Sequence, residues 1–319
     1  MMRYLLCALS AVAAVQSLTT SQMENIKALL ANLIDTANAD NERPLVAATV
    51  RLAFHDCVGG CDGCVDFSHA DNAGLQTVVG LLDAMYDDTS NGISALISRA
   101  DFYALAGIVG VEVGASLQLR CGRNCVNPTP SVTFRYGRTD CNPATVAPRS
   151  FPSGIANLTK TLQFFASEFS FTSRETVALL GAHTLGEAHR ENSGFRGRWV
   201  PRKDSFDNDY FVKLADGGGV SWSQTSLQRG TLYQWNGDDA SGRGHMMLNS
   251  DMVLYRDISP NATTGQTLTC PTNVALCPYA ATKDIVEEFA ADNAGWMAEF
   301  SDVFEKMIEH GSTNLQLPA

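Results

Sequence analysis

The sequence predicts a mostly α-helical protein whose helices are divided between two lobes, with minor β structure. Three observations support this fold class. Apolar residues recur at a spacing near 3.6 in many stretches, strand-like alternation is rare, and an irregular connector separates an N-terminal group of helices from a C-terminal group. The stretches with helical periodicity are residues 21–38, 45–55, 72–86, 93–110, 155–169, 173–182 and 283–309.

Local signals support individual elements. The face of the first stretch is formed by Ile26, Leu29, Leu30, Leu33, Ile34 and Ala37. Thr172 and Glu175 stand three residues apart ahead of residues 173–182, which is the capping-box pattern of a helix start. The clearest strand signal is the short run 132–136.

Two long segments lack helical periodicity. Residues 111–153 are rich in proline and cysteine and read as the connector, and residues 201–250 are rich in Gly, Asp and Ser and read as a long loop region. We therefore expect one unit over 21–310, with one lobe of residues 21–125 plus the helix 283–309 and another of residues 126–282.

Composition and charge narrow the class of protein. The chain has 319 residues, of which 45% are hydrophobic and 18% charged, so it is not a disordered chain. The net charge of −11 disfavours nucleic acid and anionic membranes as partners. The oligomeric state leaves no signal in the sequence.

The N-terminus, residues 1–20, reads as a signal peptide. Arg3 supplies a positive charge, the apolar run 4–15 is too short to span a bilayer, and residues 15–17 offer a small-residue cleavage site. A buried N-terminal helix is the alternative. No later stretch is apolar for long enough to predict a membrane span. We expect a secreted, extracellular protein.

Cysteine usage agrees with export. One cysteine, Cys7, lies in the signal segment, and the eight others suggest four disulfides: 57, 61, 64, 121, 125, 141, 270 and 277. Cys270–Cys277 is the expected pair because it stands apart, while pairing among the other six is open. The alternative is metal binding at Cys61 and Cys64. Asn157 and Asn261 begin glycosylation acceptor motifs.

Two histidine segments carry the candidate chemistry. Arg51 and His55 are four residues apart, so a helix places them on one face. On spacing alone, a structural interpretation is favoured, in which a salt-bridged arginine lies beside a core histidine. In the second segment, His183 ends an apolar helix, and His189 is too far along to share its face, which excludes the zinc-protease helix motif.

The first segment resembles the distal helix of the plant, fungal and bacterial haem peroxidase superfamily. The similarity lies in residues 51–57 (RLAFHDC) and 69–75 (HADNAGL). It implies that His55 is the catalytic base toward hydrogen peroxide, that Arg51 stabilises developing negative charge, and that Asn72 hydrogen-bonds His55. Arg51 should also lower the pKa of His55 and keep it neutral.

The second segment is similar to the superfamily's proximal motif. Residues 179–189 (LLGAHTLGEAH), 206–211 (FDNDYF) and 249–254 (NSDMVL) carry the similarity, which is greatest to the ascorbate-peroxidase branch. It implies a two-lobed helical fold with haem b between a distal and a proximal lobe. His183 would be the axial ligand of the iron, Asp251 its hydrogen-bond acceptor and Trp199 a ring stacked on it, with Thr184 beside the haem.

The resemblance also implies cation sites. Asp56, Gly60 and Asp62 match distal calcium ligands, but Cys64 stands where the family has a serine oxygen. On the proximal side Thr184 and Asp207 match, while Val200 and Arg202 stand where oxygen donors are expected. Arg202 could itself supply the positive charge.

Two departures bear on the reductant and the compartment. Asn192 replaces the arginine that contacts ascorbate in that branch, and Phe54 is the distal aromatic residue of secreted plant and fungal members. The mixture resembles secreted invertebrate members of the superfamily. We therefore expect a haem peroxidase that oxidises a small phenolic-type or other one-electron donor. A secreted haem-binding or structural protein with little turnover is the alternative, although it would not need Arg51, His55 and Asn72.

Overall fold

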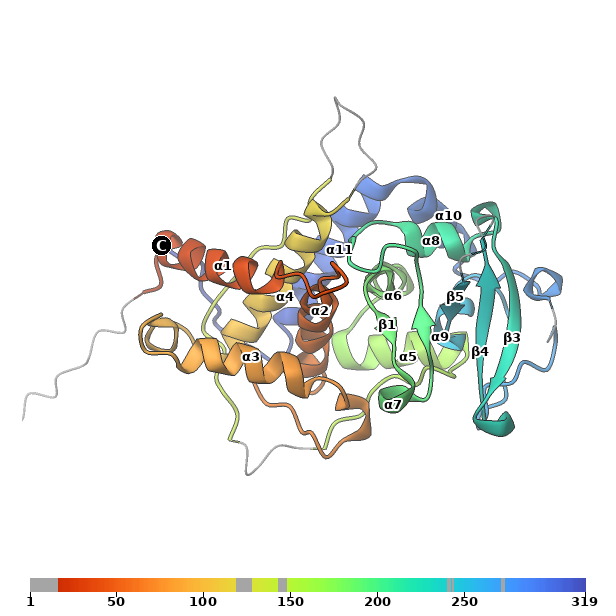
Figure 1. Cartoon of the computed structure of the whole chain (residues 1–319), viewed down its shortest axis with the longest axis horizontal. Coiled ribbons are helices and arrows are strands. Elements are labelled where there is room, and N and C mark those ends of the chain that lie inside the picture. The colour runs from red at the N-terminus through yellow and green to blue at the C-terminus, as the bar shows by residue number, and fades with distance from the viewer. Residues whose placement is uncertain (1–16, 119–127, 143–147, 240–241, 243, 271–272) are drawn as a thin grey trace, which may run out of the picture.

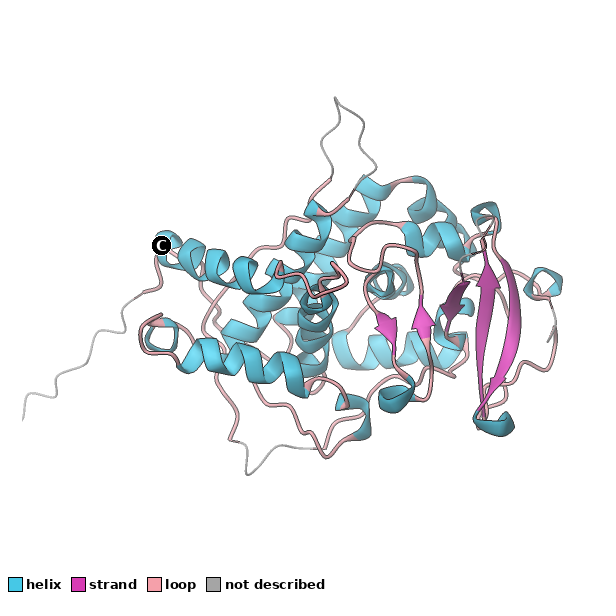
Figure 2. Ribbon diagram, viewed as in Figure 1, coloured by secondary structure: helices cyan, strands magenta, loops and turns pink. Residues whose placement is uncertain are grey.

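The computed structural model describes residues 17–118, 128–142, 148–239, 242, 244–270 and 273–319 (Figure 1). The protein is mostly helical, as predicted (Figure 2). Its α-helices are α1 (Thr20–Ile34), α2 (Pro44–Cys57), α3 (Gln76–Asp87), α4 (Arg99–Ser116), α5 (Leu158–Phe169), α6 (Ser173–Leu180), α7 (Arg190–Ser193), α8 (Asp209–Leu214), α9 (Asn249–Met252), α10 (Lys283–Ala291) and α11 (Asn293–Ile308). Short 3-10 helices include η1 (Ala70–Asn72), η2 (Ile93–Ala95) and η4 (Gly181–Thr184).

The helices form two packed groups. In the first, α4 packs against α1 and α2, and it is buried along nearly its whole length because it is apolar on every side. In the second, α10 packs against α6 and α8, and α5 against α6. The C-terminal helix α11 contacts both α2 and α6, so it joins the groups (Figure 1). The exact residues that divide the lobes stay a prediction.

Helix ends follow the local chemistry. The capping box at Thr172 and Glu175 forms as predicted and begins α6. The stretch 93–110 starts late, because Ser98 caps α4, and this helix then continues to Ser116. The stretch 283–309 divides into α10 and α11 at Asp292, whose side chain accepts a hydrogen bond from the backbone of Gly295.

The prediction of a long loop at 201–250 is wrong. This region holds an antiparallel sheet of order β3-β4-β5, made of Ser221–Leu227, Leu232–Asp238 and Gly244–Met247. The polar composition of this region suggested a loop, but its strands bury the side chains of Trp222 and Trp235. A two-stranded sheet pairs β1 (Glu187–Ala188) with β2 (Gly197–Arg198).

The strand predicted at 132–136 is also absent, and only Tyr136 forms an isolated bridge, with Gln316. The backbone here bonds side chains of α11, with the Thr133 amide donating to Glu305. An extended segment whose donors are met by side chains needs no partner strand.

The predicted Cys270–Cys277 disulfide is present. Two further bridges, Cys57–Cys61 and Cys64–Cys141, belong to the pairing that the sequence left open. Cys7, Cys121 and Cys125 lie outside the described residues. Among the described helices, none has the length and apolar character to cross a membrane.

Candidate active site

Helix α2 carries His55 on a face that turns toward η1. The Nδ1 atom of His55 lies 2.8 Å from Oδ1 of Asn72, and the Asn72 amide nitrogen donates to the carbonyl of Asp66 at 2.8 Å. Because the Asn72 nitrogen is used on Asp66, its oxygen faces His55 and accepts the Nδ1 hydrogen. The other ring nitrogen, Nε2, then keeps its lone pair.

Arg51 is bound by the backbone in and directly after η1. Its guanidinium donates to the carbonyl of Asp71 at 2.7 Å and to that of Ala73 at 3.1 Å. Burial lowers the pKa of Arg51, and the charge of Asp71 partly offsets this effect. An arginine stays protonated at ordinary pH even so, and a positive charge is therefore fixed one helical turn from His55.

His55 is buried, with 9% of its surface exposed. Burial, followed by the charge of Arg51, lowers the pKa of His55 to about 3, against the opposing effect of the Asn72 hydrogen bond. Arg51, the cause expected from the sequence, thus lowers the pKa of His55 less than burial does. His55 is neutral at neutral pH and can accept a proton.

Aromatic rings surround His55. The ring of Phe54 meets His55 edge-on at 5.6 Å between centroids and packs against Phe165 and Phe169 of α5. Phe151 stacks on His55 at 4.7 Å. Sequence reasoning missed Phe151, because it lies in the irregular connector and follows no periodic pattern.

The second histidine segment builds a network around a buried carboxylate. His183, in η4 directly after α6, places Nδ1 2.7 Å from Oδ1 of Asp251. The Trp199 indole donates to Oδ2 of Asp251 at 2.8 Å, and its ring stacks on that of His183 with centroids 4.5 Å apart.

Two more donors complete this network. The Tyr210 hydroxyl donates to Oδ1 of Asp251 at 2.9 Å, and the Leu248 backbone amide donates to Oδ2 at 2.7 Å. Burial would raise the pKa of Asp251, but attraction to His183 and the hydrogen bonds lower it. The carboxylate is thus ionised. Tyr210 was missed from the sequence, because only the fold brings α8 to Asp251.

The two histidine segments meet in space. An added Cβ at Gly186, three residues after His183, would lie 2.8 Å from the Cβ of Ala47. Ala47 lies one turn before Arg51 on the stripe of α2 that also carries His55. Likewise, a Cβ at Gly74 would lie 2.5 Å from the side chain of Asn192 in α7. The proximal segment therefore packs along the face of α2 and η1 that bears the distal residues.

A model of the peroxidase family matches residues 26–292. The chain belongs to this family. It is 28% identical to the cytosolic L-ascorbate peroxidase 1 of Oryza sativa subsp. indica over 282 residues, covering 85% of this chain and 87% of the relative. It is also similar to the mitochondrial cytochrome c peroxidase of Candida glabrata, with 29% identity over 308 residues, covering 92% and 72%.

Membership of the haem peroxidases makes the protein an enzyme that acts on hydrogen peroxide, and it implies haem. The residues of this peroxidase fit that group. His183 is held through Nδ1, its side chain is 31% exposed, and nothing among the described residues hydrogen-bonds its Nε2 atom. A neutral imidazole with a free Nε2 lone pair is a suitable iron ligand, and Asp251 fixes its tautomer.

The distal calcium expectation fits less well. Asp56 is fully buried, and burial together with the charge of Asp62 raises its pKa to about 8. Arg149 donates to the Asp56 carbonyl and to the Asp62 carboxylate, so both oxygens already have a cationic partner. Cys64 is bonded to Cys141 and offers no oxygen. These residues do not fit a calcium ion.

The proximal cation expectation meets a similar obstacle. Arg202 donates to Oδ2 of Asp207 at 2.8 Å and lies 3.8 Å from a carboxylate oxygen of Asp209. Thr184 is buried, and its hydroxyl has no hydrogen-bond partner among the described residues. A guanidinium is therefore paired with Asp207, one of the two residues that the family resemblance assigned to an ion.

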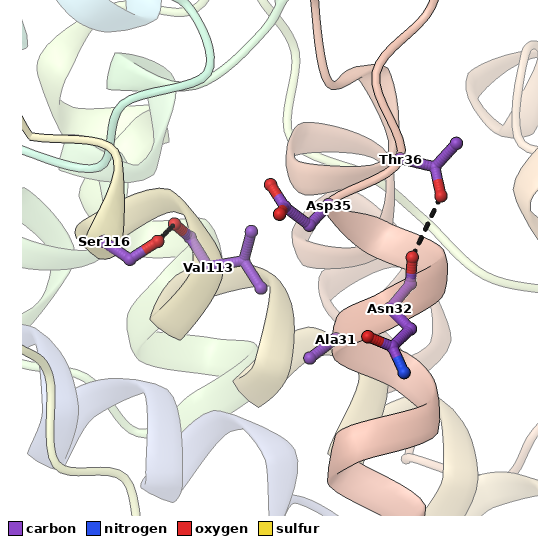
Figure 3. Close-up of a pocket in the computed structure, with 6 residues that line it drawn as sticks. All are labelled: Ala31, Asn32, Asp35, Thr36, Val113 and Ser116. Atoms are coloured by element: carbon purple, nitrogen blue, oxygen red, sulfur yellow. Dashed lines mark hydrogen bonds between the residues drawn. The ribbon is translucent and has the colours of Figure 1, made fainter.

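A hollow of about 330 Å³ between α1 and α4 is lined by none of the residues of this site (Figure 3). Its polar groups already have partners: the Thr36 hydroxyl donates to the Asn32 carbonyl, the Ser116 hydroxyl donates to the Val113 carbonyl, and the Asp35 carboxylate accepts from Arg43. It offers no group poised for catalysis. A second pocket, of about 320 Å³, lies beside the site and is lined in part by Phe151, Phe164 and Lys160.

Proposed function

We propose that the protein is a secreted peroxidase that oxidises a small phenolic-type donor one electron at a time, with haem b bound through His183. It would combine proximal residues like those of ascorbate peroxidases with the compartment of secreted members, as invertebrate secreted peroxidases do. The observation that carries the proposal is His55, a neutral base that is oriented by Asn72 and lies one turn from Arg51.

Each distal residue has a chemical role in this proposal. His55 takes a proton through Nε2 from one peroxide oxygen and returns it to the other, which leaves as water. Arg51 stabilises the negative charge that develops as the O–O bond breaks. Asn72 is a positioning residue that keeps the proton of His55 on Nδ1. Haem, when bound, supplies the electrons for this cleavage. Asp251 accepts a hydrogen bond from Nδ1 of His183, which leaves Nε2 of His183 free to bind the iron.

Turnover separates this proposal from a haem-binding protein with little activity. The purified protein, loaded with haem, is assayed with hydrogen peroxide and each of guaiacol, ascorbate and Mn(II). We expect a Soret band and rapid oxidation of guaiacol. A Soret band with no oxidation of any donor would favour the haem-binding alternative. Guaiacol oxidation slower than that of ascorbate or Mn(II) would reject the proposed donor class.

Two features support a small aromatic donor over ascorbate. Asn192 stands where ascorbate-using relatives carry an arginine, and its side chain packs on Gly74. The pocket of about 320 Å³ beside Phe151 is large enough for a single-ring phenol. Because Phe151 and Phe164 both line this pocket, we expect Phe151→Ala and Phe164→Ala each to raise the KM for guaiacol. An unchanged KM in both variants would remove this pocket from the proposal.

Secretion is supported by the position of Leu18. Leu18 is buried, its backbone amide donates to the Tyr136 hydroxyl, and its carbonyl accepts from the Ala319 amide. Thr19, the next residue, caps α1. Cleavage after Ser17 would leave all these contacts intact, so the signal segment should end slightly before residue 20. N-terminal sequencing of the exported protein should begin at Leu18, and an intact Met1 would contradict secretion by this route. Export would also make Asn157 and Asn261 available for glycosylation.

A further inference from the structure

Arg149 lies in the connector between α4 and α5, and its side chain reaches the end of helix α2 and the loop that follows it. Its side chain is only 6% exposed. One terminal nitrogen donates to the carbonyls of Asp56 at 2.7 Å and His55 at 3.3 Å, and the other donates to a carboxylate oxygen of Asp62 at 2.5 Å. The guanidinium thus joins the end of α2 to the loop behind it.

The acceptors of Arg149 are oxygens that a calcium ion would need. Calcium takes six to eight oxygen ligands, and Cys64 supplies none because it is bonded to Cys141. Oδ1 of Asp56 is buried and has no hydrogen-bond partner among the described residues. One free carboxylate oxygen does not make a calcium site, and a dication there would also be repelled by the guanidinium.

Arg149 also completes the end of helix α2. The last four carbonyls of a helix lack partners within it. Those of Phe54 and Cys57 accept hydrogen bonds from the backbone amides of Val58 and Gly60. Arg149 donates hydrogen bonds to the two carbonyls between them, those of His55 and Asp56. A cation at this end also interacts favourably with the helix dipole.

We propose that Arg149 is a built-in cation that takes the place of distal calcium and positions the end of α2 that bears His55. The peroxidase then needs no calcium for stability or for its reaction with peroxide. On the proximal side, Arg202 donates to Asp207 and likewise supplies a side-chain cation in place of a metal ion.

Calcium dependence of the melting temperature tests this inference without any turnover. For wild-type holoenzyme, we expect the same melting temperature in EDTA and in millimolar CaCl2. Arg149→Ala removes the positive charge and frees the Asp56 carbonyl and the Asp62 carboxylate, which together with Oδ1 of Asp56 and water can ligate calcium even though Cys64 supplies no oxygen. The melting temperature of this variant in EDTA should therefore fall, and calcium should raise it again. The matched control Arg174→Ala, which loses ion pairs with Glu288 and Glu299, should show no calcium response.

The reaction rate gives a second readout that loss of stability alone would not produce. In EDTA, Arg149→Ala should react with peroxide at least about tenfold more slowly, as is typical when support behind a site residue is lost, and calcium should restore the rate. If that variant does not fold, titration of wild-type protein with CaCl2 still decides, and we expect no binding. The inference is overturned if wild-type protein binds calcium or has a lower melting temperature in EDTA. It is also overturned if Arg149→Ala folds and calcium changes neither its melting temperature nor its rate of reaction with peroxide.

Discussion

Replacing Asp251 by asparagine should weaken haem binding and also lower the melting temperature, and the two effects can be measured separately. The carboxylate receives four hydrogen bonds, from His183, Trp199, Tyr210 and the Leu248 amide. Asparagine keeps one acceptor oxygen and presents an NH2 group in place of the other. The indole and the backbone amide can only donate, whereas imidazole and hydroxyl can also accept. The NH2 group should therefore turn toward His183 and Tyr210.

This orientation changes the tautomer of His183. Its Nδ1 atom would accept from the amide, so its hydrogen would move to Nε2, the atom needed for iron. Loss of such support behind a metal ligand typically weakens metal binding about 10–100-fold. A hydrogen bond to a charged group contributes about 1 kcal/mol more than a neutral one. Four such changes amount to about 4 kcal/mol, or a fall of about 6 °C in melting temperature for a protein of this size.

Haem titration of the apoprotein, followed by the Soret band, measures the first effect, and thermal unfolding measures the second. Asp257→Asn is the matched control, because Asp257 is exposed and, among the residues that the structure describes, its side chain bonds only Ser259. A haem dissociation constant for Asp251→Asn within about threefold of wild type would refute the tautomer argument.

The remaining predictions concern the groups around the two histidines. Because His55 loses its ability to accept a proton once it is protonated, the rate of reaction with peroxide should persist in mild acid and fall only as pH drops through about 3, measured by pH-jump stopped flow. Arg51→Leu removes one cause of the low pKa, so this acid limb should move upward yet stay below 6.5, and the rate should fall about 10²-fold; an unmoved limb would show that Arg51 has no electrostatic influence on His55. Tyr210→Phe should lower the melting temperature by about 2–3 °C, for a loss of about 1–2 kcal/mol, with the Soret band retained; a loss as large as that in Asp251→Asn would contradict the assigned share of the network. Asn192→Arg should raise the rate with ascorbate, whereas Asn192→Gln should not; equal rates would mean that this position does not select the donor.

The helical part of the fold is largely readable from the sequence because each helix carries its own periodic pattern and caps. The sheet β3-β4-β5 is not, since strands rich in Ser, Gln and Gly are stable only once Trp222 and Trp235 are buried against the rest of the protein. A composition-based interpretation therefore mistakes them for loop.

The site divides in the same way. His55 and His183 stand in continuous motifs, so their segments could be recognised directly. Tyr210, Phe151 and Arg149 act on partners 41, 96 and 93 positions away, and each position lacks a local pattern. Only the folded chain shows that they reach Asp251, His55 and Asp56.

The role of His55 as the proton acceptor is tested most directly by stopped-flow reaction of haem-loaded His55→Leu with hydrogen peroxide. We expect a Soret band like that of wild type, because His183 and Asp251 are untouched, and a rate of reaction with peroxide that is reduced at least about 10²-fold. A variant that binds haem and reacts at the wild-type rate would contradict the central claim that His55 activates peroxide.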